Sequence, residues 1–106
     1  MSISDRYRGI AEDARVLLED LRQAAGDEES REIRIVAQAV TQLRELEDQV
    51  GEIPRIRLES KLTPVLLKAH SSLDRARLLM EEQGAEDRAS SVWDMEQKLY
   101  RLLNDL

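Results

Sequence analysis

Apolar residues recur at alternating intervals of four and three along the first 25 residues of the chain. The positions are Ile3, Tyr7, Ile10, Ala14, Leu17, Leu21 and Ala24. This spacing places one apolar stripe along an α-helix, and the apolar neighbours Ala11, Leu18 and Ala25 make it wider than a two-stranded coiled coil needs. The stripe therefore predicts a helix over about residues 4–25 that packs within a helical bundle.

Three further segments, at about residues 28–50, 64–83 and 85–104, carry helical apolar spacing as well. Gly26 and Gly84 separate neighbouring segments, and glycine favours the conformation at which helices end. Asp27 is the expected N-cap of the second helix. The sequence thus predicts an all-α fold, an antiparallel four-helix bundle built from two αα-hairpins in a single domain over residues 1–106.

The stretch over residues 51–63 allows two interpretations. Thr63 followed by Pro64 is a favourable helix start, which makes residues 51–63 a connection between the hairpins. The alternative is one long third helix that starts at Pro54 and is kinked at Pro64. We expect residues 51–63 to form a connection between the two hairpins.

Composition removes several classes of function. The chain has no cysteine, which excludes disulfides, thiolate metal sites and cysteine nucleophiles. Its first residues lack the apolar core of a signal peptide, and no apolar run approaches the length of a membrane span. We therefore expect a cytoplasmic protein.

Charge is unevenly distributed in a chain whose net charge is −6. That net charge argues against nonspecific binding of nucleic acid and of anionic membranes. Residues 54–80 nevertheless carry six basic and two acidic side chains. We expect this basic segment to pack beside the acidic helices, and the alternative is that Arg55, Arg57 and Lys61 bind an acidic partner or a phosphate.

Glu47 and Glu96 interrupt the apolar stripes of the second and fourth helices. We expect each carboxylate to lie at the edge of the core, in water. Buried together, they would instead bind a metal or raise each other's pKa. A di-metal bundle also requires Glu-x-x-His pairs, which the chain lacks, so no metal or cofactor is expected.

The run Glu28-Glu29-Ser30-Arg31-Glu32, followed later by Glu45-Leu46-Glu47-Asp48, resembles the acidic signature of the all-α nucleotide pyrophosphatases related to MazG and the dimeric dUTPases. The resemblance implies a Mg²⁺-dependent enzyme that holds the ion with carboxylates on two adjacent helices. In one straight helix, however, Glu28 and Glu45 would lie about 25 Å apart. This hypothesis therefore requires a break in the helix near residues 38–41.

His70 is the only histidine, and Lys68-Ala69-His70-Ser71-Ser72-Leu73 is similar to the phosphorylated segment of histidine phosphotransfer domains, which are also four-helix bundles. Those domains show H-x-L-K-G, whereas here leucine comes one position later and Asp74 replaces the lysine. The resemblance implies phosphate transfer through an exposed His70.

The leading hypothesis is a noncatalytic protein–protein interaction module that presents helix faces to a protein partner. The fourth helix carries more apolar surface than one stripe uses, which makes self-association plausible. The candidates for that contact are Trp93, Met95, Tyr100 and Leu102. The alternative is that these four side chains simply complete the core.

Overall fold

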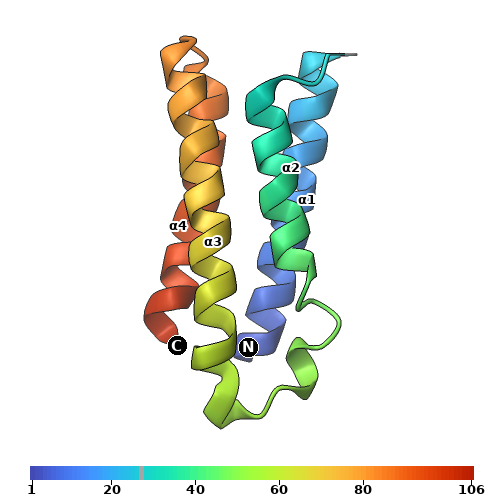
Figure 1. The fold of residues 1–106 in the computed structure, drawn as a ribbon, viewed down its shortest axis with the longest axis vertical. Coiled ribbons are helices and arrows are strands. Elements are labelled where there is room, and N and C mark those ends of the chain that lie inside the picture. Colours follow the sequence, from blue (N-terminus) through green and yellow to red (C-terminus); the bar gives the residue numbers. More distant parts are fainter. Residues whose placement is uncertain (27) are drawn as a thin grey trace.

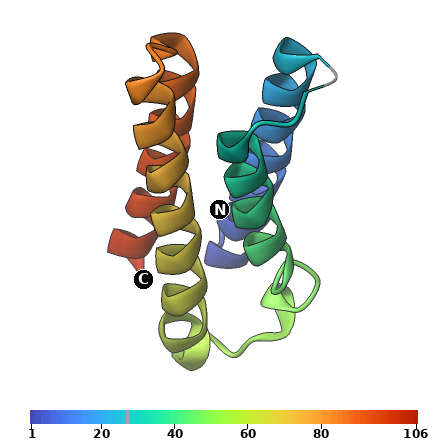
Figure 2. The ribbon, with the colours of Figure 1, turned by 45° about the horizontal axis from the view of Figure 1, so that its top comes forward.

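The computed structural model describes residues 1–26 and 28–106. Its elements are α1 (Ile3–Ala25), α2 (Arg31–Arg44), the short 3-10 helix η1 (Val50–Glu52), α3 (Arg55–Glu82) and α4 (Glu86–Asp105). The predicted all-α four-helix bundle is confirmed: α1 and α2 form one hairpin, α3 and α4 form the other, and both termini lie at the same end (Figures 1 and 2).

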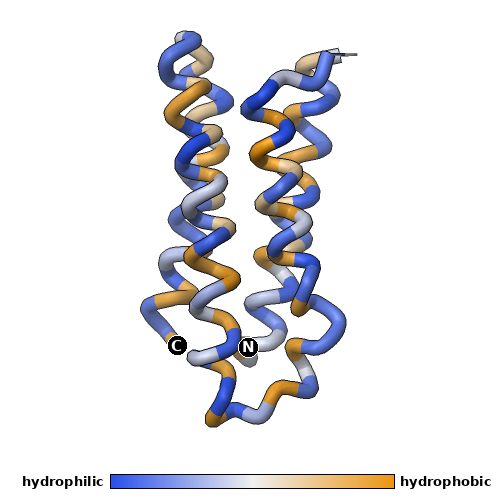
Figure 3. The backbone as a smooth tube through the Cα atoms, in the orientation of Figure 1, coloured by the Kyte–Doolittle hydropathy of each residue, from blue (hydrophilic) through white to orange (hydrophobic). Residues whose placement is uncertain are grey.

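The bundle is packed most closely around α3. α3 lies in close contact with both α2 and α4, whereas α1 lies in looser contact with α2 and α4. Apolar and polar residues alternate along every helix in Figure 3, as amphipathic helices require. None of the helices among residues 1–26 and 28–106 combines the length and the apolar character needed to cross a bilayer.

Serine side chains fix the starts of α1 and α2. The Ser2 hydroxyl accepts the Asp5 backbone N–H at 3.1 Å, and the Ser30 hydroxyl accepts the Ile33 N–H at 3.4 Å. α2 therefore begins at Arg31 rather than at residue 28. Asp27, the expected N-cap, lies outside the described residues.

α2 ends at Arg44, six residues before the predicted end, and two side chains of α1 bind backbone carbonyls in this region, one of which, that of Leu43, a longer helix would use. The Tyr7 hydroxyl donates to the Leu43 carbonyl at 2.5 Å, and the Ser4 hydroxyl donates to the Val50 carbonyl at 3.1 Å. Residues 45–49 form turns, and η1 follows. The periodicity of α2 could not reveal these contacts, since both donors lie on another helix.

The expected connection over residues 51–63 is wrong, and the long-helix alternative holds. α3 begins at Arg55, and Pro64 lies inside it. Leu58 is half-buried against the core and Leu62 is fully buried, so the added turns bury apolar surface. Proline removes one helical hydrogen bond, but burial of one leucine stabilises by about 1.5–3 kcal/mol. Pro64 itself is exposed, so its ring does not disturb the core.

We expect Tyr7→Phe to lower the free energy of unfolding by about 1–2 kcal/mol, because the Leu43 carbonyl would lose its donor next to a fully buried ring. Urea unfolding followed by far-UV circular dichroism measures the change. Tyr100→Phe is the matched control, since that ring is exposed. Equal effects of the two substitutions would contradict the role assigned to Tyr7.

Candidate functional site

Exposed basic side chains run along α3. Arg55, Arg57, Lys61, Lys68 and Arg75 are all exposed, and among residues 1–26 and 28–106 none of them forms an ion pair or a side-chain hydrogen bond. We expected the basic segment to pack beside the other helices, and α3 does pack against α2 and α4. Five of its six basic residues nevertheless form no ion pair within the described part of the chain. Only the sixth, Arg77, forms ion pairs.

Four of these residues share one face of α3. Lys61, Lys68 and Arg75 follow one another at seven-residue intervals, and Arg57 precedes Lys61 by about one turn. They lie opposite the buried stripe of the same helix, and the half-exposed side chains of Leu67 and Leu78 border them. The six residues, which we call the α3 basic face, are Arg57, Lys61, Leu67, Lys68, Arg75 and Leu78.

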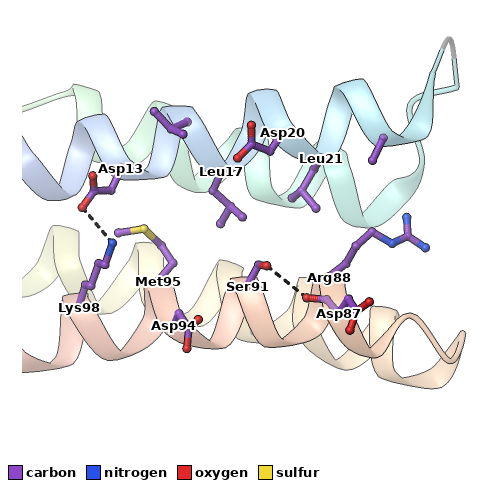
Figure 4. A pocket seen from close by; sticks show the side chains of 12 residues that line it. Asp13, Leu17, Asp20, Leu21, Asp87, Arg88, Ser91, Asp94, Met95 and Lys98 are labelled. Carbon is purple, nitrogen blue, oxygen red and sulfur yellow. Dashed lines mark hydrogen bonds and ion pairs between the residues drawn. The ribbon is translucent and has the colours of Figure 1, made fainter.

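A groove of about 380 Å³ lies between α1 and α4, where the bundle is packed less closely (Figure 4). Leu17 and Leu21 point from α1 toward α4, and Met95 lies across from them. Val16, which is half-exposed, and Ala24 extend the apolar lining along α1. The groove thus has an apolar floor that the bundle leaves partly open.

Aspartates line both sides of this groove: Asp13 and Asp20 on α1, and Asp87 and Asp94 on α4. Asp13 is paired with Lys98 at 3.1 Å, whereas the other three form no ion pair within the described part of the chain. Arg88 is the other basic residue of the lining. We call this surface the acidic groove.

The four apolar candidates on α4 separate into two groups. Leu102 is fully buried and Met95 is only 3% exposed, so both belong to the core, and Met95 also forms part of the groove floor. The expectation that these two form a surface contact is therefore corrected. Trp93 and Tyr100 are about half exposed, and the Trp93 ring lies 5.4 Å from the Arg77 guanidinium carbon, a cation–π contact.

The expectation that Glu96 lies in water is wrong, because its side chain is fully buried between α3 and α4. Arg77 Nε donates to Glu96 Oε2 at 3.1 Å, and the same guanidinium binds Asp74 and Glu81, each at 2.7 Å. Glu96 Oε1 lies 3.8 Å from His70 Nε2 and has no hydrogen-bond partner among residues 1–26 and 28–106. Arg77 therefore compensates much of the charge that this buried carboxyl brings into the core.

Burial raises the pKa of Glu96 to about 7, and the hydrogen bond and negative charge of Asp74 act in the same direction. Arg77 opposes this rise without cancelling it. Hydrogen bonding from Arg77 meanwhile holds the pKa of Asp74 below its ordinary value. Two neighbouring carboxyls thus have different pKa values, because burial disfavours the charge of Glu96 while hydrogen bonding from Arg77 favours that of Asp74.

Glu47, the other acidic residue of the stripes, lies at the edge of the core with 20% of its side chain exposed. Arg15 donates to both of its carboxylate oxygens at 2.7 Å, and these bonds lower the pKa of Glu47. Glu47 and Glu96 therefore have separate arginine partners, and the structure does not bring them together as one carboxylate pair.

The acidic run that resembles the nucleotide pyrophosphatases is not gathered into one site. α2 is a single unbroken helix over Arg31–Arg44, so the required break near residues 38–41 does not occur. Glu32 is buried and accepts a hydrogen bond from Gln83, while Glu29 binds Arg22. Across residues 1–26 and 28–106, no group of three or more acidic or histidine side chains is arranged to hold a metal ion.

His70 does not have the open position that the phosphotransfer resemblance requires. Its side chain is 31% exposed, and its Nε2 atom faces the buried Glu96. An acceptor of phosphate needs that nitrogen free for attack on a phosphoryl donor. The structure directs it toward the core side of α4 instead.

The acidic groove was missed by reasoning from the sequence, although a signal for it exists. Asp13 and Asp20, like Asp87 and Asp94, are separated by seven residues and flank the apolar stripes of their helices. What the sequence does not show is that α1 and α4 become neighbours.

Comparisons with protein-family models, with curated proteins and with solved structures find no match.

We expect Glu96→Gln to stabilise the protein at high pH. The unfolded chain releases the Glu96 proton near the ordinary pKa of 4.5, whereas the folded chain keeps it up to about pH 7. The unfolded state then binds fewer protons, so the free energy of unfolding of the wild type falls as the pH rises through this range. At about pH 8 the variant should exceed the wild type by about 1–3 kcal/mol.

Urea unfolding at about pH 8 and at about pH 4.5, where the two proteins should nearly coincide, measures this difference. The control is Glu59→Gln, which neutralises an exposed glutamate of α3. A difference between Glu96→Gln and the wild type that is the same at both pH values would refute the raised pKa.

Proposed function

We propose that this chain is a noncatalytic protein–protein interaction module that binds an acidic helical surface of a protein partner through the α3 basic face. The observation that carries the proposal is the set of exposed, unpaired basic side chains on this face, in a chain of net charge −6. An acidic protein with 22 Asp and Glu residues has many carboxylates to pair with them internally, yet these basic side chains point into solvent.

The chemistry of the face favours an amphipathic helix as partner. Heptad spacing places Lys61, Lys68 and Arg75 about 10.5 Å apart, which matches carboxylates at the same spacing on a facing helix. Leu67 and Leu78 supply apolar surface beside them. Exposed ion pairs contribute only about 0–1 kcal/mol each, so the leucines provide most of the affinity and the charges provide orientation and selectivity.

A protein partner fits this surface better than a nucleic acid does. The basic residues form a narrow line on one helix, whereas the remainder of the chain is strongly acidic. A long polyanion would therefore meet repulsion beyond the α3 basic face. We place this activity in the cytoplasm, because the chain has no cysteine to benefit from an oxidising compartment.

A labelled synthetic helical peptide with leucines on one face and glutamates at seven-residue spacing should bind the protein. Fluorescence anisotropy measures the affinity, with the same peptide carrying lysine for glutamate as the comparison. We expect Lys61→Glu combined with Lys68→Glu to weaken binding of the glutamate peptide about tenfold or more, because attraction becomes repulsion at two facing positions.

The matched control combines Arg34→Glu with Arg101→Glu, which changes the net charge equally at exposed positions on α2 and α4. This control should bind nearly as the wild type does. Equal weakening in both double variants would reduce the effect to net charge and contradict a specific face. Binding of a short duplex DNA in preference to the peptide would overturn the choice of a protein partner.

A further inference from the structure

We infer that the acidic helical surface recognised by the α3 basic face is the acidic groove between α1 and α4 of a second copy of this chain. The inference rests on the proposed function, since it names the partner of the same face. It assigns a role to the groove where α1 and α4 pack less closely on each other (Figure 4).

Charge complementarity is the first argument. Asp20, Asp87 and Asp94 of the groove form no ion pair within the described residues. Lys61, Lys68 and Arg75 of the α3 basic face likewise form no ion pair there. The seven-residue spacing that separates those basic residues also separates Asp87 from Asp94, so one helix laid along the groove meets carboxylates at its own repeat of about 10.5 Å.

Apolar surface is the second argument. Leu67 and Leu78 are about half exposed on the α3 basic face. The groove offers Val16, which is also half exposed, together with the partly buried Leu17. Docking α3 into the groove would remove both apolar surfaces from water at once, which neither surface achieves within one chain.

The arrangement of the two surfaces determines the form of the assembly. The α3 basic face and the acidic groove share no residue, so one copy can use both at the same time. The contact joins two different surfaces and is not related by a two-fold axis. Such heterologous contacts produce rings when the rotation closes and open filaments when it does not. Every open assembly therefore still presents one free face at one end and one free groove at the other.

The test uses sedimentation velocity on the full chain over a range of concentrations. The wild type should form species larger than a dimer, whose mean mass rises with concentration and falls as the ionic strength is raised from about 0.05 to about 0.5 M. A face variant, Lys61→Glu with Lys68→Glu, and a groove variant, Asp20→Asn with Asp94→Asn, should each be monomeric. Circular dichroism verifies that both remain helical.

Mixing the two variants in equal amounts gives the decisive result. The face variant keeps an intact groove and the groove variant keeps an intact face, so the mixture should form a dimer and nothing larger. A chain that carries Lys68→Glu together with Asp20→Lys exchanges the two charges and should assemble better than either single variant. The double variant Arg34→Glu with Arg101→Glu should assemble as the wild type does.

Other outcomes overturn the inference, and they are distinguishable from failure of the proposed function. A mixture that remains monomeric, or that forms species larger than a dimer, contradicts the assignment of face to groove. A wild type that is monomeric at every concentration but binds the glutamate peptide leaves the proposed function standing and removes the second copy as partner. A wild type that neither self-associates nor binds the glutamate peptide overturns both the inference and the proposed function.

Discussion

The rest of the structure depends on the burial of one continuous apolar stripe on α3. Its residues, all at most 1% exposed, are Leu62, Leu66, Ala69, Leu73, Ala76 and Met80. α2 and α4 both pack closely on α3, so this stripe sets the position of three helices at once. Because a helix has only one side opposite its buried stripe, the same packing determines which residues of α3 face the solvent. The basic face is therefore a consequence of how the core is assembled.

The buried Glu96 shows what the interface between α3 and α4 tolerates. An ionised carboxylate in the core is costly unless a cation compensates it, and Arg77 supplies that cation from the facing helix. The guanidinium is in turn held by Asp74 and Glu81 on its own helix and covered by the Trp93 ring. These contacts connect one turn of α4 to one segment of α3, and a shift of either helix would separate them. These contacts favour one register of α4 against α3, whereas the apolar stripes of the two helices alone would permit other registers.

The sequence predicted what depends on residues near one another in the chain. We could predict the helical periodicity, the hairpin turns at Gly26 and Gly84, and the unusual charge of residues 54–80. It failed where distant residues decide the outcome. Tyr7 of α1 binds the Leu43 carbonyl where α2 ends, burial of Leu62 accompanies a helix that runs through Pro64, and Arg77 compensates part of the charge of the buried Glu96. Each correction requires knowing which helices are neighbours.

Aspartates are concentrated where α1 and α4 pack less closely. Four aspartates line the two sides of the groove, and the Asp13–Lys98 pair is the one ion pair that crosses it within the described part of the chain. Beside these like charges, Val16 is half exposed and Leu17 is only partly buried, so this side of the bundle keeps some apolar surface in water. A basic helix laid along this groove would reduce the repulsion and cover the floor together. The two features that weaken this side of the monomer are thus the features that would stabilise a complex with a basic, leucine-bearing helix face.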